Sequence, residues 1–192
     1  MIIHPAVLFV IKMIVMKKFT PSFAAICLAL VLFAVQATVS GTARAASVAA
    51  PSFSGKTVDG KPFSSSSLKG KGYIVNFFAT WCPPCRAEIP DMVEVQKKYE
   101  KKGFTFVGIA VNETLPKVQN FMKSSGITYP VLMATPELIR TFSGYAAGGI
   151  SGIPTSFVVD SSGQLIGVVV GGRSQEAFEQ MVNQALKPKA GK

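Results

Sequence analysis

Two cysteines separated by two prolines are the residues of this sequence best suited to covalent chemistry. Cys82 and Cys85 follow the apolar run 73–78 and begin a mixed polar and apolar stretch that extends to Lys102. This order places the pair where a strand ends and a helix begins, and the positive end of a helix dipole favours a thiolate there. Two cysteines at this spacing can close a small disulfide and open it again, which predicts thiol-disulfide exchange.

The folded part of the chain has few other side chains that could do such chemistry. The third cysteine, Cys27, and the only histidine, His4, both lie in the apolar N-terminal segment. The folded part therefore lacks an imidazole for a Cys-His nucleophile, and it lacks the further Cys or His ligands of a zinc site. We expect no metal, and no cofactor other than a redox-active Cys82–Cys85 disulfide.

The charge balance favours an ordinary solvated surface over a nucleic-acid binding site. The 192-residue chain has a formal net charge of +10, and residues 46–192 alone carry 16 basic and 10 acidic residues, or +6. The lysines are spread along the chain and are not interleaved with aromatic residues, so we expect no nucleic-acid binding. The length fits one domain plus a targeting segment.

Residues 1–45 have the composition of an export signal. A short basic region precedes the apolar core Phe23–Val35, and Ala43-Arg44-Ala45 offers small residues where a signal peptidase reads the chain. We expect cleavage after this triplet, with an uncleaved membrane anchor as the alternative and Met13 or Met16 as alternative starts. The protein is then periplasmic or otherwise extracytoplasmic, where its cysteine pair faces no glutathione buffer.

The elements that must position the cysteines follow from the hydrophobic pattern of the remaining chain. We expect a linker at 46–52, a domain at 53–187 and a C-terminal tail at 188–192. A βαβ crossover followed by a hairpin predicts an α/β fold with a mixed central sheet flanked by helices. The predicted elements are a hairpin at Asp59-Gly60, strands at 73–78, 104–111, 129–133, 156–160 and 165–170, and helices at 84–102, 115–125, 136–142 and 174–186.

Three motifs give the chain a resemblance to a known family. They are the stretch from Val75 to Pro90 around the cysteines, Gly152-Ile153-Pro154-Thr155, and Phe157-Val158-Val159-Asp160 with Gly163. In this order they resemble the thioredoxin fold, and within it the exported TlpA/ResA-like thiol-disulfide oxidoreductases, which include the cytochrome c maturation reductants. The resemblance covers most of residues 51–187, and it implies that residues 112–149 contain the extra helix and strand that this family inserts.

The motif residues suggest a division of roles. Cys82, nearer the exposed end of the helix, is expected to attack a partner disulfide, and Cys85 to resolve the mixed disulfide. The resemblance implies that Glu88, one turn after Cys85, lies beneath the disulfide and moves protons. The alternative is a first-turn glutamate that only complements the helix dipole. Asn76 stands where ordinary thioredoxins carry a buried acid, so Glu88 is the remaining candidate for proton transfer.

The neighbours of the cysteines are expected to tune the chemistry and to bind substrate. Pro83 and Pro84 have no N–H to stabilise a Cys82 thiolate, which favours a reductant over an oxidant. The resemblance implies that the Ile153–Pro154 bond is cis, which would leave the Ile153 backbone free to pair with a substrate, with a trans bond as the alternative. Trp81 either guides docking or belongs to the core.

We therefore expect an exported, monomeric enzyme that reduces protein disulfides through the Cys82/Cys85 dithiol and is recharged by a membrane thiol donor. The resemblance implies apocytochrome c or copper-chaperone cysteines as substrates. One alternative is a peroxiredoxin-like peroxide reductase, which would need a hydroxyl residue where Ala79 stands. The other is a copper-carrying assembly factor, for which the pair would supply only two soft ligands.

Overall fold

The computed structural model describes residues 48–187 of the chain. The predicted signal or anchor at 1–45 and the predicted tail at 188–192 lie outside the described residues. A six-stranded sheet with the order β1-β8-β7-β4-β5-β6 forms the centre of the fold. Strand β4 (Gly72–Phe78) pairs in parallel with β5 (Phe104–Ala110) and antiparallel with β7 (Thr155–Val159), which confirms the predicted mixed sheet.

The remaining elements agree closely with the predicted ones. The Asp59-Gly60 hairpin is a separate two-stranded sheet, and the helix predicted at 84–102 is an α-helix followed by a 3-10 turn. The bounds are β2 (Ser54–Lys56), β3 (Pro62–Ser64), β6 (Val131–Met133), β8 (Gln164–Val170), α3 (Pro83–Tyr99), α4 (Leu115–Ser125), α5 (Pro136–Ser143), α6 (Gln175–Ala185), and the 3-10 turns η1 (Ser65–Leu68) and η2 (Glu100–Lys102).

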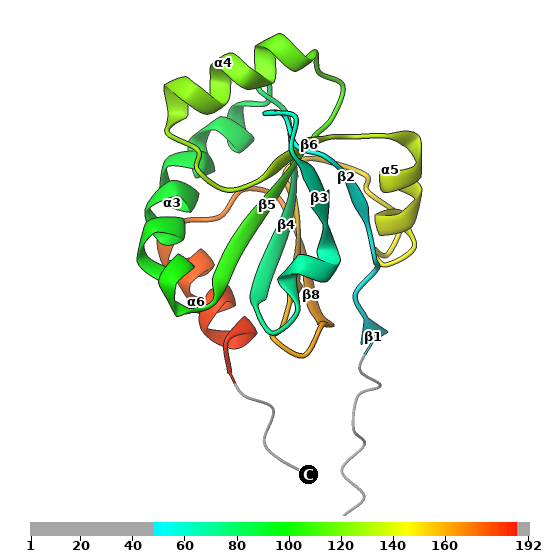
Figure 1. Ribbon diagram of the computed structural model, residues 1–192, viewed down its shortest axis with the longest axis vertical. Helices are drawn as coiled ribbons and strands as arrows, with labels where there is room; N and C mark the ends of the chain where they lie inside the picture. The colour runs from blue at the N-terminus through cyan, green and yellow to red at the C-terminus, as the bar shows by residue number, and fades with distance from the viewer. Residues whose placement is uncertain (1–47, 188–192) are drawn as a thin grey trace, which may run out of the picture. The chain divides into compact units, whose positions relative to one another are not determined.

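The strand that leads to the cysteines is buried at all seven of its positions. Helices α3 and α6 lie on one face of the sheet, and α5 lies on the other (Figure 1). The ring of Phe142 on α5 packs edge-on against Phe77 of β4 and Phe157 of β7, with ring centroids 5.3 and 5.0 Å apart. The strand-to-helix junction is therefore held from both faces of the sheet.

Two residues of the expected linker belong to the central sheet instead. Residues 46–52 were expected to be a featureless linker, but β1 (Val48–Ala49) pairs antiparallel with β8 at the sheet edge. Two small residues carry no period that could distinguish a strand from a linker, which explains the error.

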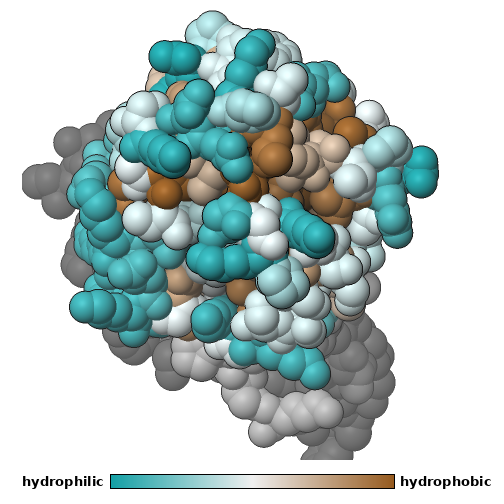
Figure 2. Space-filling view, turned by 45° about the horizontal axis from the view of Figure 1, so that its top comes forward, coloured by the Kyte–Doolittle hydropathy of each residue, from teal (hydrophilic) through white to brown (hydrophobic). Residues whose placement is uncertain are grey.

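Helix α3 begins at the end of the sheet that is uppermost in Figure 1. Figure 2 tilts this end toward the viewer, and hydrophobic residues gather on part of it between hydrophilic ones. Among the large hydrophobic side chains that the described chain exposes are Trp81, Leu115 and Ile139. The end of the sheet that carries the cysteines is therefore partly apolar.

Candidate active site

Cys82 and Cys85 form a disulfide, with their Cα atoms 5.3 Å apart. Cys82 is the N-cap residue of α3, and Cys85 lies in the first turn of that helix, as the sequence predicts. Cys82 exposes 4% of its surface and Cys85 none, while the flanking Trp81, Pro83 and Pro84 are exposed. A partner therefore has access to Cys82 before Cys85.

The two prolines change what the start of the helix offers to Cys82. Pro83 and Pro84 occupy the first two helical positions, and the Cys82 side chain makes no capping hydrogen bond within the described chain. An N-cap side chain ordinarily accepts a hydrogen bond from the N–H of the second or third helical residue. Since Pro84 has no N–H, a Cys82 thiolate has fewer donors here than at an ordinary helix start.

Glu88 is a buried carboxylic acid on the same helix as the cysteines. It exposes only 3% of its surface, so it is not a solvated first-turn glutamate, and that alternative is wrong. Its Oε1 accepts a 2.9 Å hydrogen bond from Asn76 Nδ2, and its Oε2 accepts a 3.0 Å hydrogen bond from the backbone N–H of Arg173. Burial raises the pKa of Glu88 to about 7, although both hydrogen bonds act in the opposite direction.

Asn76 has a structural role that the sequence did not reveal. Its Nδ2 also donates a 3.0 Å hydrogen bond to Ser156 Oγ, so one buried amide links β7, β4 and α3. The sequence identified Asn76 only as the residue that stands where ordinary thioredoxins carry a buried acid. The available signal was a single polar side chain within an apolar, fully buried strand, because such a group needs a hydrogen-bond partner.

The loop before β7 lies against the disulfide. The Ile153–Pro154 bond is cis, which confirms the prediction. Cys82 Sγ lies 3.7 Å from the carbonyl oxygen of Ile153, so a reduced Cys82 can donate its S–H to this oxygen. The N–H of Ile153 donates to no acceptor among the described residues and is available to a bound segment.

Trp81 lies at the surface beside the cysteines. Trp81 exposes 58% of its surface, so the alternative that it belongs to the core is wrong. Its Nε1 donates a 3.4 Å hydrogen bond to the carbonyl oxygen of Asn112, which follows β5 and has a φ of 51°. The indole is therefore held open at the surface by the loop after β5.

The same loop holds the residue before Trp81. Glu113 Oε1 accepts a 2.6 Å hydrogen bond from the backbone N–H of Thr80 and a second one from the Thr80 hydroxyl. Arg86 Nη1 donates a 3.2 Å hydrogen bond to the Thr80 carbonyl oxygen. Glu113 was not found from the sequence, because nothing in its spacing links it to Thr80.

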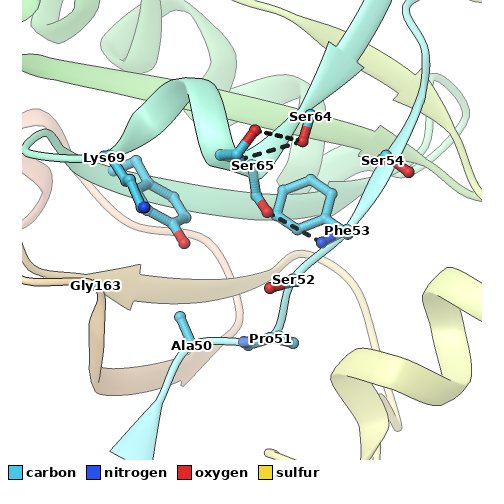
Figure 3. Close-up of a pocket in the computed structure, with 11 residues that line it drawn as sticks. Ala50, Pro51, Ser52, Phe53, Ser54, Ser64, Ser65, Lys69 and Gly163 are labelled. Atoms are coloured by element: carbon cyan, nitrogen blue, oxygen red, sulfur yellow. Dashed lines mark hydrogen bonds between the residues drawn. The ribbon is translucent and has the colours of Figure 1, made fainter.

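Away from the cysteines, a pocket of about 350 Å³ lies between the segment that enters β2 and the turn η1 (Figure 3). Two of its hydroxyl groups form hydrogen bonds within the chain: Ser65 Oγ accepts the N–H of Phe53 at 3.1 Å, and Ser64 caps η1. Neither a cysteine nor a carboxylate is among the residues described around it. The redox chemistry therefore belongs to the other end of the sheet.

Residues 48–187 form neither a cluster of metal ligands nor a membrane-spanning helix. No three His, Cys, Asp or Glu side chains in this part of the chain gather as ligands for a metal ion. None of the helices in this range combines the length and hydrophobicity needed to cross a bilayer. The predicted export signal, with a membrane anchor as its alternative, is at 1–45, outside this range.

The chain is similar in sequence and structure to several known proteins. The redoxin family matches residues 45–186. The thiol-disulfide oxidoreductase ResA of Bacillus subtilis (strain 168) is 34% identical over 139 residues, which cover 72% of this chain and 74% of the relative.

Two solved structures extend the comparison. The crystal structure of a thiol:disulfide interchange protein of the thioredoxin family from Chlorobium tepidum TLS has a TM-score of 0.72 and 70% identity, covering 74% of this chain and 99% of that one. The structure of a secreted Mycobacterium tuberculosis disulfide oxidoreductase, described as homologous to E. coli DsbE, has a TM-score of 0.59 and 25% identity, covering 69% of this chain and 95% of that one.

Proposed function

The chain belongs to the redoxin family and is a thiol-disulfide oxidoreductase of the thioredoxin fold, and we propose that it reduces protein disulfides outside the cytoplasm. The observation that carries this proposal is the position of the Cys82–Cys85 disulfide, at the start of α3 and beside the cis-proline loop. There, Cys82 Sγ lies 3.7 Å from the Ile153 carbonyl oxygen. In the reduced protein this position lets the Cys82 thiolate meet a partner segment that pairs with the Ile153 backbone.

The first step is attack by Cys82. Its thiolate forms a bond to one sulfur of the partner disulfide, and the bond between the two partner sulfurs breaks. The second partner sulfur leaves as a thiolate and takes a proton from water. The product is a mixed disulfide between Cys82 and the partner.

The second step is resolution by Cys85. Its thiolate attacks the Cys82 sulfur, closes the Cys82–Cys85 disulfide and releases the remaining partner sulfur as a thiolate. Two electrons have then passed from the dithiol to the partner. Cys85 must lose a proton before it attacks, and Glu88 lies one helical turn away with a pKa of about 7, so its carboxylate can accept that proton near neutral pH.

The direction of electron flow is inferred from the start of the helix. With Pro83 and Pro84 in place, the Cys82 thiolate loses a donor that most helix starts supply. A reduced form that is stabilised less gives up its electrons more readily. The pair is therefore expected to act as a reductant, and a membrane thiol donor is expected to recharge it.

The location and the partners are the finer part of the proposal. The export-like composition of residues 1–45 and the similarity to a protein described as secreted both support an extracytoplasmic site of action. Disulfide-bearing exported proteins are the proposed partners, with apocytochrome c or copper-chaperone cysteines as the substrate classes. We propose that the enzyme acts as a monomer.

Reduction of a disulfide-bonded protein such as insulin, with a chemical dithiol to recharge the enzyme, tests the proposal. Cys82→Ser is expected to abolish turnover above the background of the dithiol, because the attacking thiolate is gone. Cys85→Ser is the matched control: when it is pre-reduced and mixed with the substrate without the dithiol, it keeps the attack and accumulates a mixed disulfide at Cys82. Full turnover by Cys82→Ser would contradict this mechanism.

A further inference from the structure

Residues 171–173 form the turn that joins β8 to α6, and this β8–α6 turn lies against Glu88. The backbone N–H of Arg173 donates the 3.0 Å hydrogen bond to Glu88 Oε2, and a Cβ placed on Gly172 would lie 3.8 Å from the same oxygen. Asn76 bonds to the other oxygen of the carboxylate. The turn therefore supplies one of the two hydrogen bonds that hold this buried acid.

The β8–α6 turn also contacts two other parts of the active site. The N–H of Gly171 donates a 2.8 Å hydrogen bond to the carbonyl oxygen of Pro154, the cis-proline. Gly172 lies close to the start of α3, since a Cβ placed on it would be 3.4 Å from the carbonyl oxygen of Pro84. The conformation of this short turn therefore decides how its N–H groups meet both Glu88 and the cis-proline loop.

The Arg173 side chain folds back over the turn that carries it. Two consecutive glycines make the turn flexible, because glycine loses more backbone entropy on ordering than any other residue. Arg173 Nη1 donates to the carbonyl oxygens of Gly171 and Gly172 at 3.2 and 2.8 Å, and Nη2 donates to that of Val170 at 3.1 Å. The guanidinium is planar and its donors are fixed, so these bonds hold three successive carbonyl groups in one arrangement.

We propose that Arg173 is a positioning residue for the resolving step, because its side chain holds the β8–α6 turn in the arrangement that aims the turn's backbone N–H at Glu88. Arg173 acts through Glu88 and exchanges no proton itself. The proposal rests on the proposed function, because Glu88 matters here as the acceptor of the Cys85 proton. Without the guanidinium, the glycines leave the turn free to move its N–H away from the carboxylate.

The charged and titratable groups around Glu88 support this role. Burial raises the pKa of Glu88 most; the bond from Asn76, then the Arg173 N–H and then the Arg173 charge lower it, and the charge of Asp91 on α3 raises it. Tyr129, which precedes β6, has a pKa raised by burial and by the Glu88 charge, so it is neutral near pH 7. Among these groups Arg173 alone is a cation, and it favours the carboxylate through both its N–H and its charge.

Amide hydrogen exchange in the oxidised protein, where neither Cys82 nor Cys85 titrates, measures whether the turn is held. Arg173→Ala keeps the backbone N–H and removes the guanidinium. We expect the protection of the amide at position 173, corrected for the intrinsic rate of the new residue, to fall about tenfold. Arg173→Lys keeps the charge without the planar donors, so we expect its protection to fall about threefold. The amides of β7 should keep their protection in both variants, which shows that the protein is still folded.

The pH dependence of the resolving step measures whether the held turn acts on Glu88. In single turnover, Arg173→Ala should move the inflection for release of the partner thiol to higher pH by about half a unit, because the aimed N–H and the charge both favour the carboxylate. Arg173→Lys should move it in the same direction by less. Arg140→Ala is the matched control, since Arg140 is an exposed arginine on α5, on the other face of the sheet. It should change neither the inflection nor the protection at position 173.

The outcomes separate this proposal from the proposed function. Undiminished protection at position 173 in both variants would overturn the proposal; if the inflection still moved, Arg173 would act through its charge alone. Lost protection with an unmoved inflection would also overturn it, because the held turn would then have no part in resolution. Failure of the wild-type enzyme to reduce insulin would instead overturn the proposed function, while the exchange measurement, which needs no partner, would still report on the turn.

Discussion

Asn76 Nδ2 donates a 2.9 Å hydrogen bond to Glu88 Oε1, between the central strand and the helix that carries both cysteines. This hydrogen bond and the one from the Arg173 backbone favour the charged carboxylate, whereas burial favours the neutral acid. Burial is the largest of these effects, and the pKa of Glu88 rises to about 7. Glu88 can therefore either accept or donate a proton near neutral pH.

The raised pKa makes stability depend on pH. Between the ordinary pKa of 4.5 and the folded value of about 7, the folded protein holds a proton that the unfolded chain has lost, so stability falls as pH rises through this window. A difference of about 2.5 pKa units corresponds to roughly 3 kcal/mol. Denaturant unfolding of the oxidised protein at pH 5 and pH 8 should show this loss, and Glu88→Gln should remove most of it. An identical loss in the variant would contradict the assignment.

The hydrogen bond from Asn76 should tune the resolving step. If Glu88 accepts the Cys85 proton, release of the partner thiol in single turnover should speed up as pH rises through about 7. Asn76→Ala removes a bond that lowers the Glu88 pKa, so the inflection should move to higher pH. Ser156→Ala is the matched control, since Ser156 bonds to Asn76 and not to Glu88, and its inflection should stay in place. An unmoved inflection in Asn76→Ala would argue against this role.

Glu113 should position the segment in front of Cys82. Glu113→Ala removes the acceptor for both the N–H and the hydroxyl of Thr80, and we expect attack on protein disulfides to slow by about tenfold, in line with the loss of a positioning contact. Trp81 is the only tryptophan in the sequence, so its fluorescence reports the same loosening. Glu113→Gln keeps an acceptor oxygen and should restore most of the rate.

The exposed Glu94→Ala is the control for Glu113, because Glu94 also lies outside the core and forms only an exposed ion pair with Lys97. It should change neither the rate nor the Trp81 emission. If Glu113→Ala leaves the emission unchanged, Glu113 does not hold this segment.

Phe142 should be essential for the stability of the sheet face that α5 covers. Its ring lies 5.0 to 5.3 Å from the rings of Phe53, Phe77 and Phe157, and the residue is 1% exposed. Phe142→Ala is expected to cost about 3–5 kcal/mol of unfolding free energy in denaturant titrations, the usual range for such a truncation. Phe121→Ala, at a partly buried position, should cost clearly less. Equal costs would mean that Phe142 does not anchor α5.

Most of the fold follows from local sequence signals. Three examples are signals that lie within a few neighbouring residues: the continuous apolar run that predicts β4, Gly126 that ends α4, and Ser174 that caps the start of α6. The edge strand β1 was missed because two small residues have no distinguishing pattern. The cysteine pair and the cis bond before Pro154 were found because each belongs to a short motif.

The contacts around the cysteines were less accessible to sequence reasoning. The bond between Asn76 and Glu88 depends on how α3 lies on β4, and the bonds from Thr80 to Glu113 join residues 33 positions apart. Neither follows from spacing within one element. The approach of α5 and of the loop before β7 to Trp81 is harder still to predict, because these segments meet only in the folded chain.

The reduction potential of the Cys82–Cys85 pair, measured by equilibration with glutathione buffers, tests the proposed direction of electron flow most directly. With Pro83 and Pro84 withholding donors, we expect a value nearer to about −270 mV, as in thioredoxin, than to about −120 mV, as in the oxidant DsbA. Pro84→Ala supplies an N–H to the helix start and should make the pair more oxidising. A wild-type value at about −120 mV would contradict the reductant account.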